Sequence, residues 1–530
     1  MHRHSAADAI EAARAPRARV FSLAGVSIST LDAAAGLSGI LISSCFLRFQ
    51  LWPLAWFAFA PFLWALARTR DRREALRLAL ITGMFTNVPA FYWLTYTINV
   101  FGGFGYFLST FFYLCLSLYS TVQFVLFALA LRRTGVGPLA LSAPLIWVTL
   151  EFLYPHLFPW RLGHSQFLAP VLIQLGDLTG PYGLSFVMLW FAAGVAHVCG
   201  ARRDAKPLVA ACVAVIGVIA YGAVRLPAVD AAMQAAPKIK VALAQGNITI
   251  KEKGDFRYFD VNLDKYAELS RTGQQGVDLL VWPETVSQHW IPADSSHLGA
   301  KEMPFAELRT YMYFGALAYR LTGPRQADEF NSAFFVGPDS TVLGRYDKQI
   351  LMPFGEYIPL EWMLPQKVRE LSPATASFRS GEGTHVFEVP GKYRFAPLIC
   401  YEDLVASMSR NASAAGAQFL LNILNDAWYG NTAAPYEHQA LALWRTVENR
   451  RFLLRGSNSG VTSIIDAAGR VVAEGGLFTA EVVSGEVSLM EMRTFYTRYG
   501  DAFAWFVVAL AAVLLVRTGT VAARRRSPGD

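Results

Sequence analysis

Long apolar runs, separated by short polar loops, fill the chain as far as Arg225 and return once near residue 510. A run of about 20 apolar residues is long enough to cross the hydrocarbon core of a bilayer as a helix. The clearest run is 207–224, which holds no charged residue. The pattern predicts eight membrane-spanning helices, at about 24–46, 49–67, 78–98, 104–131, 137–153, 180–201, 207–224 and 502–516.

Basic residues cluster in the short loops, and their placement tests the number of spans. The clusters precede the first run and follow the second, fourth, sixth and eighth runs: Arg14, Arg17 and Arg19; Arg68, Arg70, Arg72 and Arg73; Arg132 and Arg133; Arg202, Arg203 and Lys206; Arg524, Arg525 and Arg526. If the spans alternate in direction, all these clusters lie on one side, which the positive-inside rule makes cytoplasmic. The segment between the seventh and eighth runs is then predicted to lie outside the cytoplasm.

The pattern changes between residues 238 and 490, where short apolar or alternating runs are separated by mixed, charged stretches. Short runs of this kind are typical of strands, and longer amphipathic stretches are typical of helices. The expected strands lie at 238–245, 277–282, 395–399 and 419–424, with a hairpin over 460–472, and the expected helices at about 258–272, 302–321, 402–415 and 434–450. Strands that alternate with helices predict a layered α/β domain.

The chain is therefore expected to be a multi-domain membrane protein, in which an α-helical transmembrane bundle carries an α/β domain. The expected parts are a cytoplasmic N-terminal extension at 1–20, a bundle of seven spans at 21–230, the α/β domain at 238–490, a final transmembrane helix at 500–518 and a basic cytoplasmic tail at 519–530. Composition agrees, because 54% of the residues are hydrophobic and only 16% are charged, whereas soluble globular chains have about 25% charged residues. A disordered chain, a coiled coil and a small disulfide scaffold are excluded.

Charge and cysteine content add little to this interpretation. The net charge of +7 comes largely from arginines in the loops between apolar runs, so membrane topology explains it better than nucleic-acid binding. Four of the five cysteines lie in apolar runs, where a cysteine usually acts as a small buried hydrophobe. Only Cys400 lies in the α/β segment, and no CxxC pair indicates a zinc or redox site.

Three residues of the α/β segment form a candidate catalytic set. Glu284 and Cys400 each follow an expected strand, where reactive groups gather in open α/β sheets, and Lys348 lies in a loop. A carboxylate can take the proton of a thiol, and an ammonium group can stabilise both the thiolate and an oxyanion. Taken singly, the cysteine is more often structural, the glutamate can begin a helix, and the lysine can be a solvated surface charge.

The motifs around these residues resemble the signatures of the nitrilase superfamily. They are Val-Trp-Pro-Glu-Thr at 281–285, Tyr-Asp-Lys at 346–348 with Pro-Phe-Gly-Glu at 353–356, and Ile-Cys-Tyr-Glu-Asp at 399–403. The resemblance covers 238–490 and implies a Glu-Lys-Cys triad on an α-β-β-α sandwich. Three motifs in the same chain order make it specific.

The membrane portion narrows the resemblance, because a nitrilase-like domain placed before the last of eight spans is similar to the apolipoprotein N-acyltransferase family. Further matching stretches are 158–165, 245–247, 425–430 and 455–460. The charged stretch 251–260 has no clear match, and no functional residue is assigned there.

The resemblance implies a two-step acyl transfer at the bacterial inner membrane, with the α/β domain on the periplasmic side. A phospholipid, usually phosphatidylethanolamine, donates its sn-1 acyl chain to the cysteine. The thioester is then attacked by the N-terminal amine of an S-diacylglyceryl-cysteine on an apolipoprotein. This is the last step of lipoprotein maturation. The resemblance implies no metal, organic cofactor or nucleic-acid partner.

The roles implied for single residues follow the same resemblance. Cys400 is expected to be the nucleophile and Glu284 the general base, while Lys348 and the backbone N–H of Tyr401 stabilise the oxyanion. Glu356 is expected to orient Lys348 or Glu284. Three residues keep two interpretations each: Glu402 either shapes the site or begins the next helix, and Trp428 and Tyr429 either line an acyl pocket or only pack.

Two other functions remain open from the residues alone. A membrane-tethered amidase or nitrilase would use the same triad with water as acceptor, although one helix would suffice as its tether. A transporter or export component with a degenerate sensor domain would not need Glu284, Lys348 and Cys400 intact. Glu151, Arg161, His164 and Asp177, near the ends of expected spans, are interpreted as structural.

Overall fold

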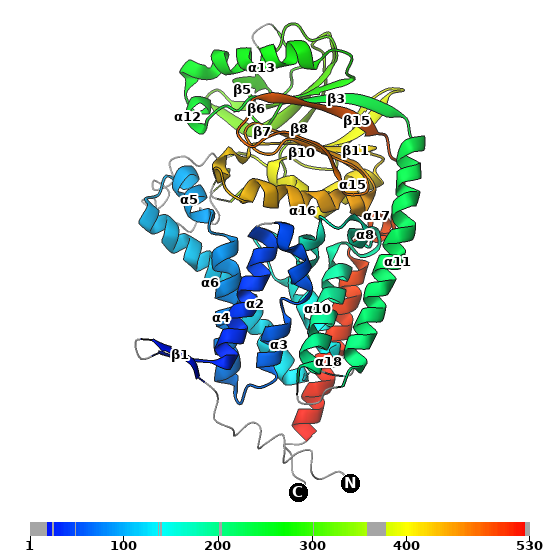
Figure 1. Ribbon diagram of the computed structural model, residues 1–530. Helices are drawn as coiled ribbons and strands as arrows, with labels where there is room; N and C mark the ends of the chain where they lie inside the picture. Colours follow the sequence, from blue (N-terminus) through cyan, green and yellow to red (C-terminus); the bar gives the residue numbers. More distant parts are fainter. Residues whose placement is uncertain are drawn as a thin grey trace, which may run out of the picture.

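The computed structural model describes residues 19–23, 26–47, 49–135, 137, 140–200, 204–299, 302–353, 355–357 and 378–524. A helical bundle lies at one end of the molecule and a layered α/β domain at the other (Figure 1). Most of the expected extension at 1–20 and the end of the basic tail, 525–530, lie outside the described residues.

The bundle contains helices of very different length. Its main helices are α2 (Thr30–Leu47), η1 (Phe49–Trp56), α3 (Ala60–Leu66), α4 (Arg72–Ala90), α5 (Leu94–Gly102), α6 (Tyr106–Thr134), α7 (Ser142–Leu153), α10 (Pro181–Val198), α11 (Lys206–Ala235) and α18 (Ala502–Arg524). Among the described residues, α6, α10 and α11 are long and apolar enough to cross a membrane. Four shorter apolar helices coincide with the first, second, fifth and eighth expected spans. Eight complete spans are therefore not established.

The expected span 78–98 is divided in two. α4 contains Pro89 and ends at Ala90, and α5 begins at Leu94. The ring of Trp93, between them, packs against Phe158 with centroids 5.1 Å apart, and its indole N–H donates to Glu437 of the α/β domain. A proline leaves one helical hydrogen bond unmade. The contact of Trp93 with the second domain stabilises the break between α4 and α5. A hydropathy pattern does not reveal such a contact.

The α/β domain contains two facing sheets. One has the strand order β14-β13-β12-β11-β10-β9 and the other β15-β3-β4-β6-β7-β8, with β5 beside β6. The strands are β3 (Lys238–Gln245), β4 (Leu279–Val281), β5 (Ser287–Pro292), β6 (Tyr311–Gly323), β7 (Gln326–Val336), β8 (Val342–Asp347), β9 (Phe387–Val389), β10 (Tyr393–Ile399), β11 (Phe419–Leu424), β12 (Phe452–Ser457), β13 (Ser463–Ile465), β14 (Val471–Glu474) and β15 (Glu481–Ser488).

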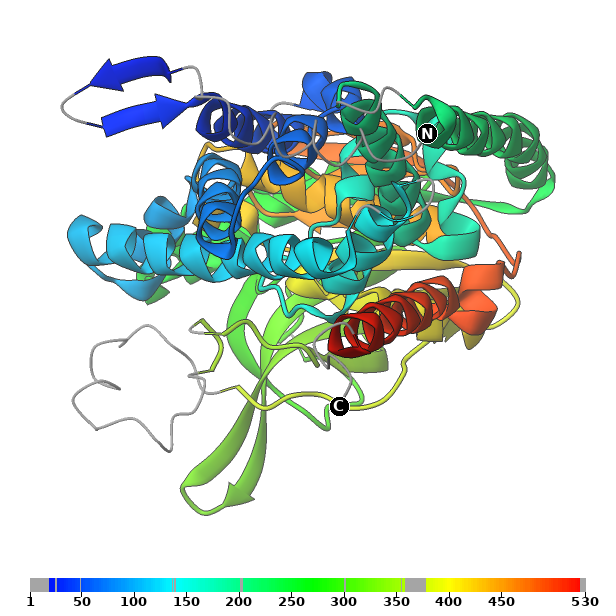
Figure 2. The same cartoon turned by 90° about the horizontal axis from the view of Figure 1, so that it is seen from below.

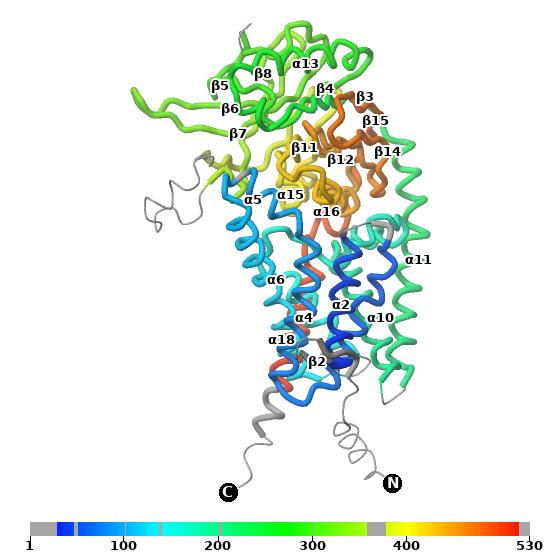
Figure 3. Tube along the Cα trace, turned by 60° about the vertical axis from the view of Figure 1, so that its left-hand side comes forward, coloured from blue at the N-terminus to red at the C-terminus, as the bar shows by residue number. Residues whose placement is uncertain are grey.

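Helices cover both outer faces of the sandwich. α13 (Phe259–Gly273) lies on the face away from the bundle, while α15 (Ala406–Ala414) and α16 (Ala434–Asn449) lie between the other sheet and the bundle (Figures 1 and 3). Val241, Leu279, Phe335, Phe395 and Leu421 are fully buried in the core between the two sheets. The order of layers is α-β-β-α, and the predicted layered α/β fold is confirmed.

The predicted helix at 302–321 is wrong, because most of it is strand β6. This strand pairs antiparallel with β7 from Met312 to Gly323, and Figure 2 shows the hairpin projecting from the side of the domain. Tyr313 faces the core between the sheets and Phe314 faces the core beneath α13. A central strand that is apolar on both faces lacks the polar alternation that marks a strand. Aromatic residues nevertheless favour strands.

A buried ion pair joins the α/β domain to the bundle. The Nη2 atom of Arg450, at the end of α16, lies 2.7 Å from Oδ2 of Asp177 in α9 (Gly176–Thr179). Arg225 Nε lies 2.7 Å from the same carboxylate, and the hydroxyl of Tyr221 donates to it at 2.6 Å. Both Arg450 and Asp177 are fully buried. Asp177 thus has the structural role that the sequence indicated.

Replacement of Arg450 by methionine should destabilise the protein by at least about 2 kcal/mol, because it leaves Asp177 with Arg225 alone and removes the donor to the buried carbonyl oxygens of Gln174 and Ala467. Arg271→Met is a matched control, since Arg271 forms an exposed pair with Glu307 and exposed pairs contribute about 0–1 kcal/mol. The measurement is the thermal unfolding midpoint of detergent-purified protein. Equal midpoints for the two variants would contradict a structural role for the Arg450–Asp177 pair.

Candidate active site

The three candidate residues come from strand ends that meet at one end of the sandwich. Glu284 follows β4, Lys348 follows β8 directly, and Cys400 follows β10 directly in the facing sheet. Cys400 has a φ of 54° and Thr285 a φ of 52°, a left-handed conformation that costs about 1–3 kcal/mol for such residues. The turn at Cys400 opens the short helix η6 (Cys400–Leu404).

Gly315 of β6 permits the turn that carries Glu284. A Cβ atom at Gly315 would lie 2.4 Å from the backbone nitrogen of Thr285 and 2.6 Å from the carbonyl oxygen of Pro283. Any side chain there would push the Glu284 turn away from the sheet. The glycine therefore sets how closely the carboxylate approaches the other strand ends.

Lys348 lies between two carboxylates. Its Nζ atom is 3.3 Å from Oε1 of Glu284 and 2.9 Å from the carboxylate of Glu356. The side-chain amide of Asn331, in β7, donates to Glu284 at 2.8 Å and to Glu356 at 2.7 Å. All four side chains are buried. The structure thus brings together Lys348, Glu284 and Glu356, and adds Asn331.

These contacts determine the protonation states of Glu284, Lys348 and Cys400. Burial alone would raise the pKa of Glu284, but the charges of Lys348 and Lys253 outweigh burial and hold it below its usual value. Burial alone would lower the pKa of Lys348, but Glu284 and Glu356 raise it well above the usual value. Burial, followed by the charge of Glu284, raises the pKa of the Cys400 thiol, which Lys348 opposes. The resting site holds a carboxylate, an ammonium group and a thiol.

Glu402 ties the segment after Lys348 to the strand before Cys400. Its carboxylate accepts hydrogen bonds from the backbone N–H groups of Gln349 at 2.6 Å, Ile350 at 3.1 Å and Ile399 at 2.8 Å. The hydroxyl of Tyr346 donates to it at 2.8 Å. Burial raises the pKa of Glu402 to about 7, although these backbone donors lower it. A change at Glu402 would therefore disturb the relative placement of Lys348 and Cys400.

A buried polar network lies behind Cys400. Its members are Asn422, Asp403, His438, Asp426 and Arg455. The Asn422 amide donates to the carbonyl oxygen of Cys400 at 2.9 Å and to Asp403 at 2.5 Å. His438 bridges Asp403 at 2.9 Å and Asp426 at 3.0 Å, and Arg455 Nε lies 3.0 Å from Asp403. The network fixes the backbone of Cys400 through Asn422.

The protonation of His438 depends on its two aspartate partners. Burial alone would lower the pKa of His438, but Asp403 and Asp426 raise it to about 9. Burial would raise the pKa of Asp403, but His438 and Arg455 keep it below its usual value. The imidazolium is therefore part of the folded structure at neutral pH.

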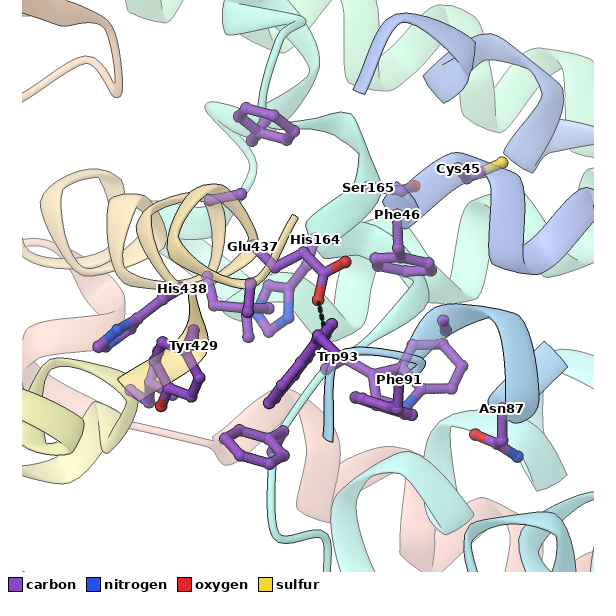
Figure 4. Close-up of a pocket in the computed structure, with 18 of the residues that line it drawn as sticks. Cys45, Phe46, Asn87, Phe91, Trp93, His164, Ser165, Tyr429, Glu437 and His438 are labelled. Atoms are coloured by element: carbon purple, nitrogen blue, oxygen red, sulfur yellow. Dashed lines mark hydrogen bonds between the residues drawn. The ribbon is translucent and has the colours of Figure 1, made fainter. Parts of the chain in front are cut away.

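A cavity lies between the α/β domain and the bundle (Figure 4). It is partly open to solvent, and most of its lining is apolar. Tyr429, in η7 (Asp426–Tyr429), lines it, and its ring lies 5.1 Å from that of Trp93. Trp428 is partly buried and is not among the described residues that line this cavity. The hydroxyl of Tyr401 donates to the carbonyl oxygen of Leu157, so Tyr401 also links the site to the bundle.

Several residues of the site were not found from the sequence. Asn331 lies in a strand that was not expected, and Lys253 lies in the stretch 251–260 that had no clear match. Asp403 stands inside the Ile-Cys-Tyr-Glu-Asp motif, which was the signal for it, whereas His438 had none. Among the described residues, no group of three or more His, Cys, Asp or Glu could hold a metal ion.

Family models match both parts of the chain. Residues 38–194 match the model of the apolipoprotein N-acyltransferase N-terminal domain, and residues 240–496 match that of carbon-nitrogen hydrolases. An apolipoprotein N-acyltransferase of Geobacter metallireducens is 37% identical over 93% of this chain and 95% of its own length. This chain belongs to the apolipoprotein N-acyltransferase family.

Two further matches are a curated relative and a solved structure. An apolipoprotein N-acyltransferase of Pseudomonas paraeruginosa is 31% identical over 90% of this chain and 93% of its own length. Among solved structures, Nit3 of Saccharomyces cerevisiae, a member of branch 10 of the nitrilase superfamily, matches 47% of this chain and 90% of its own at 19% identity and a TM-score of 0.35. The nitrilase resemblance of the α/β domain and the enzyme class expected from the sequence are confirmed by the family models and the first of these relatives.

The charge on His438 makes stability depend on pH. Because its folded pKa of about 9 lies above the ordinary value of 6.5, its contribution is complete below pH 6.5 and is lost as pH rises through 9. The thermal unfolding midpoint should therefore fall over this range more steeply in the wild type than in His438→Gln. Parallel curves for the two proteins would show that His438 is neutral in the fold.

Proposed function

We propose that the chain transfers an acyl group from a phospholipid to the N-terminal amine of a diacylglyceryl apolipoprotein, through a thioester on Cys400. One observation carries the residue assignment: a buried carboxylate and a buried ammonium group meet, and both interact electrostatically with the partly buried thiol at the end of strand β10. Family membership supports the reaction, and the names of the relatives supply the class of acceptor.

In the first step, Glu284 takes the proton of the Cys400 thiol, and the thiolate attacks the sn-1 ester carbonyl of the phospholipid. The resulting oxyanion is stabilised by Lys348 and the backbone N–H of Tyr401. The C–O bond then breaks, and Glu284 returns its proton to the departing lysophospholipid. Phosphatidylethanolamine is the expected donor. The acyl chain remains on Cys400 as a thioester.

In the second step, the α-amino group of the S-diacylglyceryl-cysteine attacks the thioester carbonyl. Glu284 removes a proton from the amine, the C–S bond breaks, and the amide of the triacylated lipoprotein is formed. Glu284 then gives the proton to the departing thiolate, which restores the thiol of Cys400. Glu356 and Asn331 hold Lys348 and Glu284 in place through both steps. Tyr429, and Trp428 beside it, are proposed to contact the acyl chain, because Tyr429 lines the cavity towards the bundle.

The proposed setting is the bacterial inner membrane, with the α/β domain at 238–490 on the periplasmic side. The bundle at 21–230 and the final helix at 500–518 would together make eight crossings, and the extension at 1–20 and the tail at 519–530 would lie in the cytoplasm. The basic clusters support this orientation. The cavity between the two parts is not lined by the triad, but Tyr429, which lines it, interacts electrostatically with Cys400, and this supports a site that opens towards lipid.

A tethered amidase is the second candidate, and only the carbon-nitrogen hydrolase model favours it. An amidase would form an acyl-enzyme with the same three residues, so the triad does not distinguish the two reactions. The match of residues 38–194 to the acyltransferase N-terminal domain does favour acyl transfer. A lipid-facing bundle is superfluous for hydrolysis of a small amide.

Incubation of the purified protein with phosphatidylethanolamine should increase its intact mass by one acyl chain, because Cys400 retains the acyl group as a thioester. Cys400→Ala should gain nothing, and Glu284→Gln should react at least about 100-fold more slowly, since it lacks the general base. Mass spectrometry of the intact protein measures all three.

The acceptor separates the two candidate functions. A diacylglyceryl-cysteine peptide should discharge the thioester, whereas water alone should leave it intact over the same time. Rapid discharge by water would identify a lipid hydrolase. Absence of any mass gain with several phospholipids would contradict the proposal and leave the amidase, to be tested with small amides.

A further inference from the structure

A second lysine contacts the backbone of the general base. Lys253 is the last residue of the short helix α12 (Ile250–Lys253), whose first turn is closed by a capping box between Thr249 and Glu252. Its Nζ atom donates to the backbone carbonyl oxygen of Glu284 at 2.6 Å. The side-chain amide of Gln288, beyond the same turn, donates to the carbonyl oxygen of Lys253. Lys253 is thus hydrogen-bonded through its side chain to Glu284 and through its backbone to Gln288.

The charges of the triad and its neighbour Glu356 do not balance. Lys348 carries one positive charge, while Glu284 and Glu356 together carry two negative charges, and all three side chains are buried. The excess negative charge opposes ionisation of the Cys400 thiol, whose pKa burial, Glu284, Asp426 and Glu356 all raise. A protonated Lys253 supplies the missing positive charge.

Among the described residues, four charged groups near Cys400 are paired with one another. His438 bridges Asp426 and Asp403, and Arg455 contacts Asp403 as well. Lys253 interacts electrostatically with both Glu284 and Cys400, each of which raises its pKa. Coupling between two sites is reciprocal, so the ammonium group of Lys253 stabilises the thiolate in return.

We propose that Lys253 is a positioning and charge-balancing residue, which anchors the backbone of Glu284 and offsets the second carboxylate so that Cys400 can ionise and the oxyanion can form. Its part in acylation rests on the proposed function. Its effect on the thiol does not, because ionisation of Cys400 needs no lipid.

The rate of the reaction should depend on the protonation of Lys253. Burial lowers the pKa of Lys253 to about 8, against the charges of Glu284 and Cys400. The ammonium group is therefore partly lost at pH 8 and absent well above it. Lys348 remains charged there, because its pKa is raised, so the support lost at alkaline pH is that of Lys253.

Alkylation of Cys400 by iodoacetamide tests the proposal without substrate. Lys253→Met should raise the apparent pKa of the thiol by about one unit, which slows alkylation at pH 7.5 about tenfold, since each unit of pKa changes the thiolate fraction tenfold. Lys251→Met is the control, because it removes the same charge from the exposed side of the same helix. Peptide mass spectrometry separates Cys400 from the other four cysteines.

An arginine variant separates charge from structure. Lys253→Arg stays charged at every pH of interest, so its rate of thioester formation should persist above pH 8, where the wild-type rate declines. Identical pH profiles for Lys253→Arg and the wild type would overturn the charge-balancing role. So would alkylation curves for Lys253→Met and Lys251→Met that superimpose. A wild type that is alkylated normally but never acylated would contradict the proposed function and leave the inference about the thiol intact.

Discussion

The active end of this molecule depends on one buried ammonium group shared by two carboxylates. Lys348 could not be buried as a cation without a carboxylate beside it, and Glu284 and Glu356 both contact it, since an unpaired buried charge is strongly unfavourable. The same is true of each carboxylate without the lysine. The contacts at 3.3 Å and 2.9 Å therefore both depend on the same ammonium group. This requirement fixes the relative positions of the elements that carry these side chains, which are the end of β4, the end of β8 and the loop that follows it.

The facing sheet is tied to this arrangement by a different group. Glu402 accepts hydrogen bonds from both sides, from the backbone after Lys348 and from the backbone before Cys400. Asn422 and its buried partners hold the carbonyl oxygen of Cys400 from behind. Hydrogen bonds to the backbone thus place the thiol near Lys348 and its two carboxylates. Such bonds tolerate less displacement than contacts between long side chains.

The sequence predicts those parts of the structure that depend on a few consecutive residues. Glu284, Lys348 and Cys400 each stand in a short motif. β3 and β11 are short alternating or mainly apolar runs whose bounds coincide with the expected ones. Asn331 could not be predicted, because its role follows from the register of β7 with β6. Lys253 depends on the path of a loop, and the break after Ala90 depends on Trp93 packing against a domain far away in sequence. The helix at 302–321 was wrong because a strand buried on both faces shows no alternation.

The buried contacts between the two parts have a consequence for how the protein can be divided. Arg450 belongs to the α/β domain, yet its charge is neutralised by Asp177 of the bundle. Glu437 likewise receives its hydrogen bond from Trp93, and Tyr401, beside Cys400, donates to the carbonyl oxygen of Leu157. A fragment cut at residue 238 would leave these polar groups uncovered on its α16 face. The α/β domain is thus structurally dependent on the bundle, which supplies the partners of these three residues.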